Sequence, residues 1–104
     1  IRASKYGNKI VKIDGIKFRS IKEGNRYRVL KSLEKVKEIS MLKLQVRFPF
    51  KVNEQLICTY VADFVYFDKA GKKVVEDVKG CITERYKLNR KLMKAIYDIT
   101  IKET

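Results

Sequence analysis

Residues 59–67 and 73–79 read TYVADFVYF and KVVEDVK, with the sequence DKAG at positions 68–71 between them. Both segments are rich in aromatic and β-branched residues, which favour strands, whereas Asp and Gly in a short polar run favour a turn. The stretch therefore predicts a β-hairpin, and the other elements are predicted on either side of it.

Upstream of this hairpin the sequence predicts a smaller hairpin, a helix and a strand. Residues 9–18 alternate around Asp14-Gly15, a pair that favours a tight hairpin turn. Ser20 and Glu23 form a capping-box pattern, and apolar residues at helical spacing extend the helix to about residue 38. Residues 44–52, LQVRFPFKV, alternate as in a strand, and Pro49 predicts an edge position or the end of pairing.

Downstream of the central hairpin, Gly80 ends the strand and Thr83 caps a helix predicted over residues 84–97. Residues 99–102 predict a short last strand. The order of elements is therefore β-hairpin, helix, three strands, helix and strand, which predicts a single α+β domain over residues 1–104 with a mixed sheet. The apolar residues expected to face the sheet from the second helix are Tyr86, Leu88, Leu92, Ala95 and Ile96.

The charge of the chain predicts a polyanionic partner. The 104 residues include 25 Lys and Arg against 12 Asp and Glu, a formal net charge of +13, and most of the excess lies in residues 1–52. Phosphate backbones are the commonest intracellular polyanion, so nucleic acid is the expected partner, although a merely lysine-rich surface is the alternative. A membrane is not expected, since the sequence has no spanning segment, no signal peptide and no basic amphipathic helix with large apolar anchors. A cytoplasmic protein is expected.

The absence of histidine excludes several classes of site. Histidine-dependent zinc fingers, catalytic triads and histidine-based nuclease motifs all need a residue that this chain lacks. Cys58 and Cys81 have no metal-type spacing, and both are expected to be reduced and structural.

The central hairpin carries the residues predicted to form the site. Strand alternation puts Asp77 and Lys79 on one face and Glu76 on the other. Closing the hairpin at residues 68–71 sets Asp63 roughly opposite Glu76 or Asp77, so two carboxylates could share a Mg²⁺ ion beside an ammonium group. This set suits phosphodiester hydrolysis, because oxygen ligands hold Mg²⁺ and the metal activates water. An ordinary ion pair between Asp77 and Lys79 is the alternative.

These residues also carry a resemblance to a known family. Glu23 on a first helix, TYVADF with Asp63, and VVEDVKG with Asp77 and Lys79 resemble the PD-(D/E)XK nuclease superfamily. The stretches YGNKIVKIDGIKFRSIKEGNRY, LKLQVRFPF and EDVKG followed by TERYKLNRKL are similar to small phage-type endonucleases of that superfamily, akin to Holliday-junction resolvases. The similarity runs from about residue 4 to residue 101. Two departures are Ala62, where the superfamily name has proline, and Gly24 in the predicted helix.

The resemblance implies a restriction-endonuclease-like core of four to five strands flanked by helices, after an N-terminal β-hairpin. It implies Asp63 and Asp77 as ligands of Mg²⁺, which Mn²⁺ could replace, Lys79 as the catalytic lysine and Glu23 as an outer ligand. The predicted function is a metal-dependent DNA endonuclease of phage or prophage origin, acting as a homodimer in recombination or replication, with branched or junction DNA as a candidate substrate. The alternatives are a non-catalytic nucleic-acid-binding module on the same fold and an RNA-binding sheet platform, whose aromatic and glycine-rich signatures are absent.

Basic residues on two elements are predicted to contact the phosphate backbone, with a solvated basic surface as the alternative. Tyr60 is predicted either to stack on bases or to join the core. Gln45 and Arg47 share a strand face, with weak grounds for placing them near the site. The predicted phosphate contacts are Lys5, Lys9, Lys12, Lys17, Arg19, Lys87, Arg90, Lys91 and Lys94.

Overall fold

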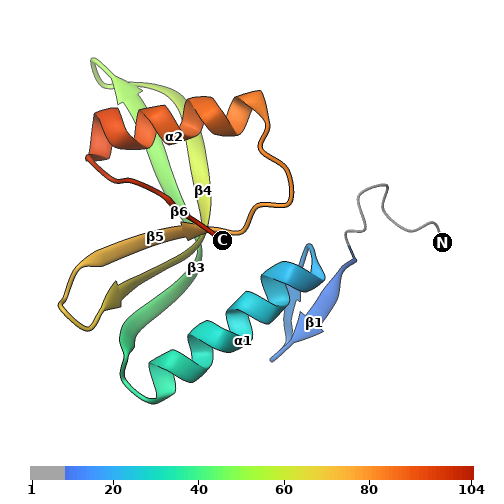
Figure 1. Cartoon of the computed structure of the whole chain (residues 1–104). Helices are drawn as coiled ribbons and strands as arrows, with labels where there is room; N and C mark the ends of the chain where they lie inside the picture. Colours follow the sequence, from blue (N-terminus) through green and yellow to red (C-terminus); the bar gives the residue numbers. More distant parts are fainter. Residues whose placement is uncertain (1–8) are drawn as a thin grey trace.

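The computed structural model describes residues 9–104 as an α+β domain with a mixed four-stranded sheet, two helices and a separate two-stranded hairpin (Figure 1). The predicted fold class and order of elements are confirmed at this level. Within residues 9–104, no helix is long and apolar enough to cross a membrane. The elements are β1 (Val11–Ile13), β2 (Ile16–Phe18), α1 (Ile21–Lys35), β3 (Ile39–Val52), β4 (Gln55–Asp68), β5 (Lys73–Asp77), α2 (Glu84–Tyr97) and β6 (Lys102–Glu103).

The sheet has the order β3-β4-β5-β6, with antiparallel neighbours except for the parallel pair β5 and β6. β3 is an edge strand, so the edge position predicted from Pro49 is confirmed. β3 and β4 are longer than predicted, since β3 begins at Ile39 and β4 begins at Gln55. The two strands are joined by a tight turn in which Asn53 and Glu54 have φ of 50° and 66°. The last strand begins at Lys102, later than predicted.

α1 covers one face of the sheet. Ser20 caps the helix, because its hydroxyl accepts a hydrogen bond from the Glu23 N–H at 3.1 Å. Tyr27 and Leu30 are buried in a cluster with Phe64. The helix ends at Lys35, before the predicted end near residue 38, and Val36 is exposed.

The hairpin of β1 and β2 packs against the start of α1 (Figure 1). Asp14 and Gly15 both have positive φ, as the predicted tight turn requires. Gly24 lies where the hairpin approaches the helix, since a Cβ there would stand 2.8 Å from Val11 Cγ2 and 2.9 Å from Ile13 Cδ1. The glycine that is unfavourable for an isolated helix is therefore needed for this contact.

α2 covers the opposite face of β5, where Val75 lies in the cluster of α2 and Val74 lies in that of α1. The predicted bounds of α2 and its Thr83 cap are confirmed. Its predicted apolar face is only partly right. Tyr86 and Met93 are buried, whereas Leu88, Ala95 and Ile96 are exposed, because the helix turns its narrower Tyr86–Met93 stripe to the sheet.

The neighbouring strands β3 and β4 change face at the same place. Ala62 and Val65 have opposite parity in β4, yet both pack in the cluster under α2. In β3 the change coincides with Gln45, whose φ is 53°, a left-handed conformation that is unusual inside a strand. Irregularities of this kind redirect side chains and recur beside active sites. Here the irregularities of β3 and β4 lie next to Asp63.

Candidate active site

Asp63 and Asp77 lie opposite each other on adjacent strands. Phe64 pairs with Glu76 in the antiparallel ladder of β4 and β5. One step further along the same register, Asp63 therefore faces Asp77. The alternative partner, Glu76, lies on the other face of β5, where the Arg26 guanidinium binds it with Nη2 2.9 Å from Oε1.

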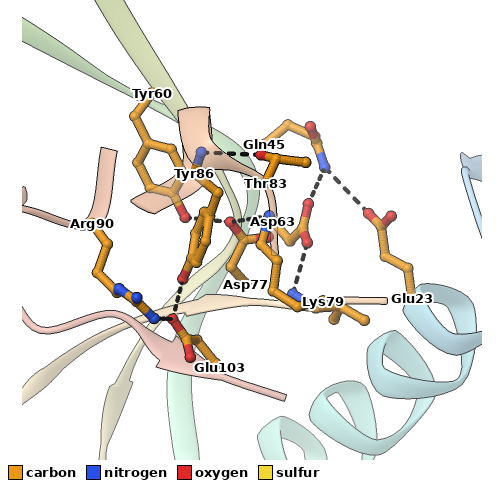
Figure 2. A network of polar contacts seen from close by, with 11 residues as sticks. Glu23, Gln45, Tyr60, Asp63, Asp77, Lys79, Thr83, Tyr86, Arg90 and Glu103 are labelled. Carbon is orange, nitrogen blue, oxygen red and sulfur yellow. Dashed lines mark hydrogen bonds and ion pairs between the residues drawn. The ribbon is translucent and has the colours of Figure 1, made fainter. Parts of the chain in front are cut away.

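Two groups hold the Asp77 carboxylate in place (Figure 2). The buried Tyr60 hydroxyl donates a hydrogen bond to Asp77 Oδ2 at 2.6 Å. Lys79 Nζ lies 3.3 Å from the same oxygen, so the predicted adjacency of Asp77 and Lys79 is confirmed. Tyr60 itself belongs to the core, as one of the two predictions for it stated, and burial together with Asp77 raises the pKa of its hydroxyl.

Lys79 is held between β5 and the start of α2, although β5 ends at Asp77. Its N–H donates to the Thr104 carbonyl at 3.0 Å, which continues the parallel pairing. Its Nζ lies 3.9 Å from the centre of the Tyr86 ring. The Tyr86 hydroxyl in turn donates to Glu103 Oε2 at 2.7 Å, as does Arg90 (Figure 2). The ammonium group is therefore oriented on two sides.

Glu23 reaches this row through Gln45. The Gln45 Nε2 group donates to Glu23 Oε2 at 3.3 Å and to Asp63 Oδ1 at 3.5 Å (Figure 2). Glu23 is only 7% exposed. Within residues 9–104, no three His, Cys, Asp or Glu side chains are grouped closely enough to hold one metal ion. The amide of Gln45 thus stands between the two carboxylates that were expected to be inner and outer ligands.

The electrostatic environment disfavours ionisation of these acids. Burial, and then the hydrogen bond and charge of Asp77, raise the pKa of Asp63 to about 8, against the opposing N–H of Val78, which donates to Asp63 Oδ2 at 2.9 Å. Burial also raises the pKa of Glu23, against the positive charge of Arg19. Carboxyl groups with raised pKa in a cleft are typical of functional sites.

A cleft of about 440 Å³ opens over the Asp63–Asp77 row. Its lining joins β3, β4, the end of β5 and the first turns of α2. Gln45 lines it, and Glu23 is not among its lining residues. The charged side chains that line it are Arg19, Arg47, Asp63, Asp77, Lys79 and Arg85. The arrangement can therefore bring an anion against four cationic groups beside two carboxylates.

Most of the predicted phosphate contacts lie away from this cleft. Arg19 lines it, and Lys5 falls outside the described residues. Lys87 and Lys94 make ion pairs with Glu84 and Asp98 on their own helix or its cap, and Arg90 pairs with Glu103. The remaining predicted contacts are exposed and do not line the cleft: Lys9, Lys12, Lys17 and Lys91.

Sequence reasoning gave no firm role to Gln45, Arg47 or Arg85, and it missed the contact of Tyr60 with Asp77. Arg47 and Arg85 were not predicted as phosphate contacts. The strand that carries Arg47 and the helix start that carries Arg85 were nevertheless both predicted. Gln45 was noted only for sharing a face with Arg47, and no local signal marks its left-handed backbone. The hydrogen bond from Tyr60 to Asp77 depends on where the end of β5 lies along β4, which only the fold determines.

Comparison with known proteins identifies one family. A family described as "Protein of unknown function (DUF1064)" matches residues 3–103. No curated protein and no solved structure matches the chain significantly.

Proposed function

The chain belongs to the DUF1064 family, whose description states no activity, and we propose that it is a Mg²⁺-dependent DNA endonuclease with a PD-(D/E)XK core. The observation that carries the proposal is the row of Asp63 and Asp77 with Lys79 Nζ 3.3 Å from Asp77, at the floor of a cleft with an arginine-rich lining. Two carboxylates, one lysine and several arginines are the groups that phosphodiester hydrolysis requires.

The residues present fit a Mg²⁺ ion. Asp63 and Asp77 offer the hard carboxylate oxygens that Mg²⁺ prefers, and the ion normally retains several water ligands, so two protein ligands suffice. The raised pKa of Asp63 indicates negative charge that the protein leaves poorly compensated. When bound, the ion would supply an activated water and would offset the charge of the scissile phosphate.

The side chains of the chain divide the remaining work. Tyr60 holds Oδ2 of Asp77 and thereby sets the direction of Oδ1. Lys79 places its ammonium next to the same carboxylate, where it can stabilise charge that develops on the phosphate. Arg47 and Arg85 line the same cleft, where they would bind flanking phosphates, because guanidinium groups pair with phosphate in a bidentate manner.

The net charge of +13 supports DNA as the substrate, since the acidic row needs a strongly basic surround to attract a polyanion. We place the activity in the cytoplasm of a bacterial host, for a phage or prophage protein in recombination or replication. Branched or four-way DNA and a homodimer belong to the same proposal. Light scattering of the protein with and without DNA would measure its mass and thereby test whether it is a dimer.

The decisive assay is a panel of labelled linear, flap and four-way DNA substrates incubated with Mg²⁺, Mn²⁺, Ca²⁺ or a chelator. Cleavage with Mg²⁺ or Mn²⁺, and its loss in Asp63→Asn and Asp77→Asn proteins that still bind DNA, is the expected result. Binding without cleavage of any substrate would instead identify a non-catalytic nucleic-acid-binding module. Cleavage at the wild-type rate in both variants would remove the proposed site.

A further inference from the structure

Gln45 combines three features that a strand residue seldom combines. Gln45 is not a glycine, yet its backbone lies in the left-handed region, with φ of 53°. Its side chain lines the cleft. Its amide nitrogen lies within hydrogen-bond distance of carboxylates from two different elements, Glu23 of α1 and Asp63 of β4.

The position of Gln45 in the ladder explains how the amide reaches both acids. Leu44 pairs with Phe64 and Val46 pairs with Ala62, so Gln45 directly faces Asp63. The left-handed backbone interrupts the regular alternation at this point, and the amide then lies between β4 and the first turn of α1 (Figure 2). A backbone strain of this kind persists only when the surroundings enforce it, and it is concentrated at functional sites.

We infer that Gln45 is a positioning residue, which holds the Asp63 carboxylate for the metal and through which Glu23 acts on the site. The inference rests on the proposed function. Glu23 accepts one N–H of the amide and thereby fixes its orientation, and the same amide nitrogen faces Asp63 Oδ1. Glu23 is thus an anchor for Gln45 and not a direct ligand, in agreement with its absence from the cleft lining.

The physical consequence concerns metal affinity. Groups that orient a metal ligand through hydrogen bonds typically change affinity about 10–100-fold when they are removed. Without the amide, the Asp63 carboxylate loses one of its two hydrogen-bond donors and keeps only the Val78 N–H. The site then has to order this side chain when the ion binds.

The test is the binding of Mn²⁺ alone to the whole chain, measured by calorimetry without DNA. Gln45→Met keeps the length of the side chain and removes the donor, and it should weaken Mn²⁺ binding at least about tenfold. Gln55→Met is the matched control, because Gln55 is exposed at the distant turn between β3 and β4 and should leave Mn²⁺ binding unchanged. If Gln45→Met does not fold, Gln45→Gly removes the same donor and relieves the positive φ.

A double-mutant cycle separates the role of Glu23 from direct ligation. If Glu23 acts through Gln45, then Glu23→Met, which removes the acceptor that glutamine would keep, weakens Mn²⁺ binding in the wild-type background and has no further effect in the Gln45→Met background. Equal or tighter Mn²⁺ binding by Gln45→Met, or fully additive losses in the double variant, would overturn the inference. Wild-type protein that binds no Mn²⁺ would instead refute the metal site of the proposed function, and the inference with it.

Discussion

Gly24→Ala tests the close packing of the β1–β2 hairpin on α1. The substitution should lower the stability of the fold, whereas the same change inside a helix usually raises it. Inside a helix, alanine is normally more favourable than glycine by up to about 1 kcal/mol. Here the new Cβ would stand 2.8 Å from Val11 Cγ2 and 2.9 Å from Ile13 Cδ1. The terminal methyl of Ile13 can move aside, whereas the β-branched Val11 side chain is stiff about χ1.

The contact with Val11 therefore decides the magnitude. Overpacking of this kind costs about 1–3 kcal/mol, so after the gain in helix propensity a net loss of about 1 kcal/mol is expected. For a domain of this size such a loss lowers the melting temperature by about 4–8 °C. Thermal unfolding followed by circular dichroism measures it directly.

Two controls isolate the cause. Gly80→Ala should leave the melting temperature nearly unchanged, because no atom lies within 4 Å of a Cβ at that position. In a Val11→Ala background, which lacks the contacted methyl, Gly24→Ala should become neutral or stabilising. A melting temperature of Gly24→Ala equal to or above that of the wild type would refute the close approach of the hairpin to the helix.

Four further predictions concern the site. Lys79→Ala should lower the turnover of DNA cleavage far more than DNA affinity, and a loss confined to affinity would make Lys79 a mere DNA contact. Tyr60→Phe should weaken Mg²⁺-supported cleavage while DNA binding in gel-shift assays stays unchanged, because only the donor to Asp77 is removed; unchanged cleavage would contradict its positioning role. Asp63→Asn should raise the melting temperature of chelator-treated protein at pH 8, since it removes a half-buried charge facing Asp77. Because the pKa of Asp63 is raised in the folded protein, the free-energy cost of ionising Asp63 grows as the pH rises toward about 8. The stabilisation by Asp63→Asn should therefore be smaller at pH 5, and a stabilisation that does not depend on pH would contradict this prediction. Arg47→Ala and Arg85→Ala should each reduce the slope of log affinity against log salt by up to about 0.9 on duplex DNA, and an unchanged slope would place them off the DNA path.

The central hairpin was the most predictable part of the fold. A turn at residues 68–71 and the period of two in KVVEDVK suffice to place Asp63 near Asp77, and the observed register sets Asp63 opposite Asp77, one of the two partners predicted for it. Strand pairing across a short turn is a local property, since chain connectivity leaves few registers available. The adjacency of Asp77 and Lys79 follows from the same alternation.

Features that depend on contacts between distant segments were not predictable. The left-handed backbone of Gln45 is of this kind, since nothing in the local sequence marks it. The tight turn at Asn53 and Glu54 was missed for a local reason, because it lacks the glycine that marks such turns. The basic residues were identifiable as a class, but the choice of Arg47 and Arg85 over the lysines of α2 depends on where the cleft opens.

The carboxylates of the sheet divide into two kinds by the number of donors that face them. Glu76 is fully buried, and it accepts hydrogen bonds from the Arg26 guanidinium, the Tyr66 hydroxyl and the Thr104 hydroxyl. Burial alone would raise the pKa of Glu76, but these partners lower it below its ordinary value. A buried carboxylate with this many partners is compensated within the fold, so its role is to fix α1 against β5.

Asp63 is the opposite case. Its donors are the Val78 N–H at 2.9 Å and the Gln45 amide at 3.5 Å, Asp77 faces it with a like charge, and its pKa is raised to about 8. Since even a half-buried charge without compensation destabilises a fold, such an arrangement persists when something outside the protein supplies the missing positive charge. A divalent cation in the cleft, next to both carboxylates, would do so for Asp63 and Asp77 together. The same reasoning explains why Glu76, one residue before Asp77, needs no cation: the alternation of β5 turns it toward Arg26.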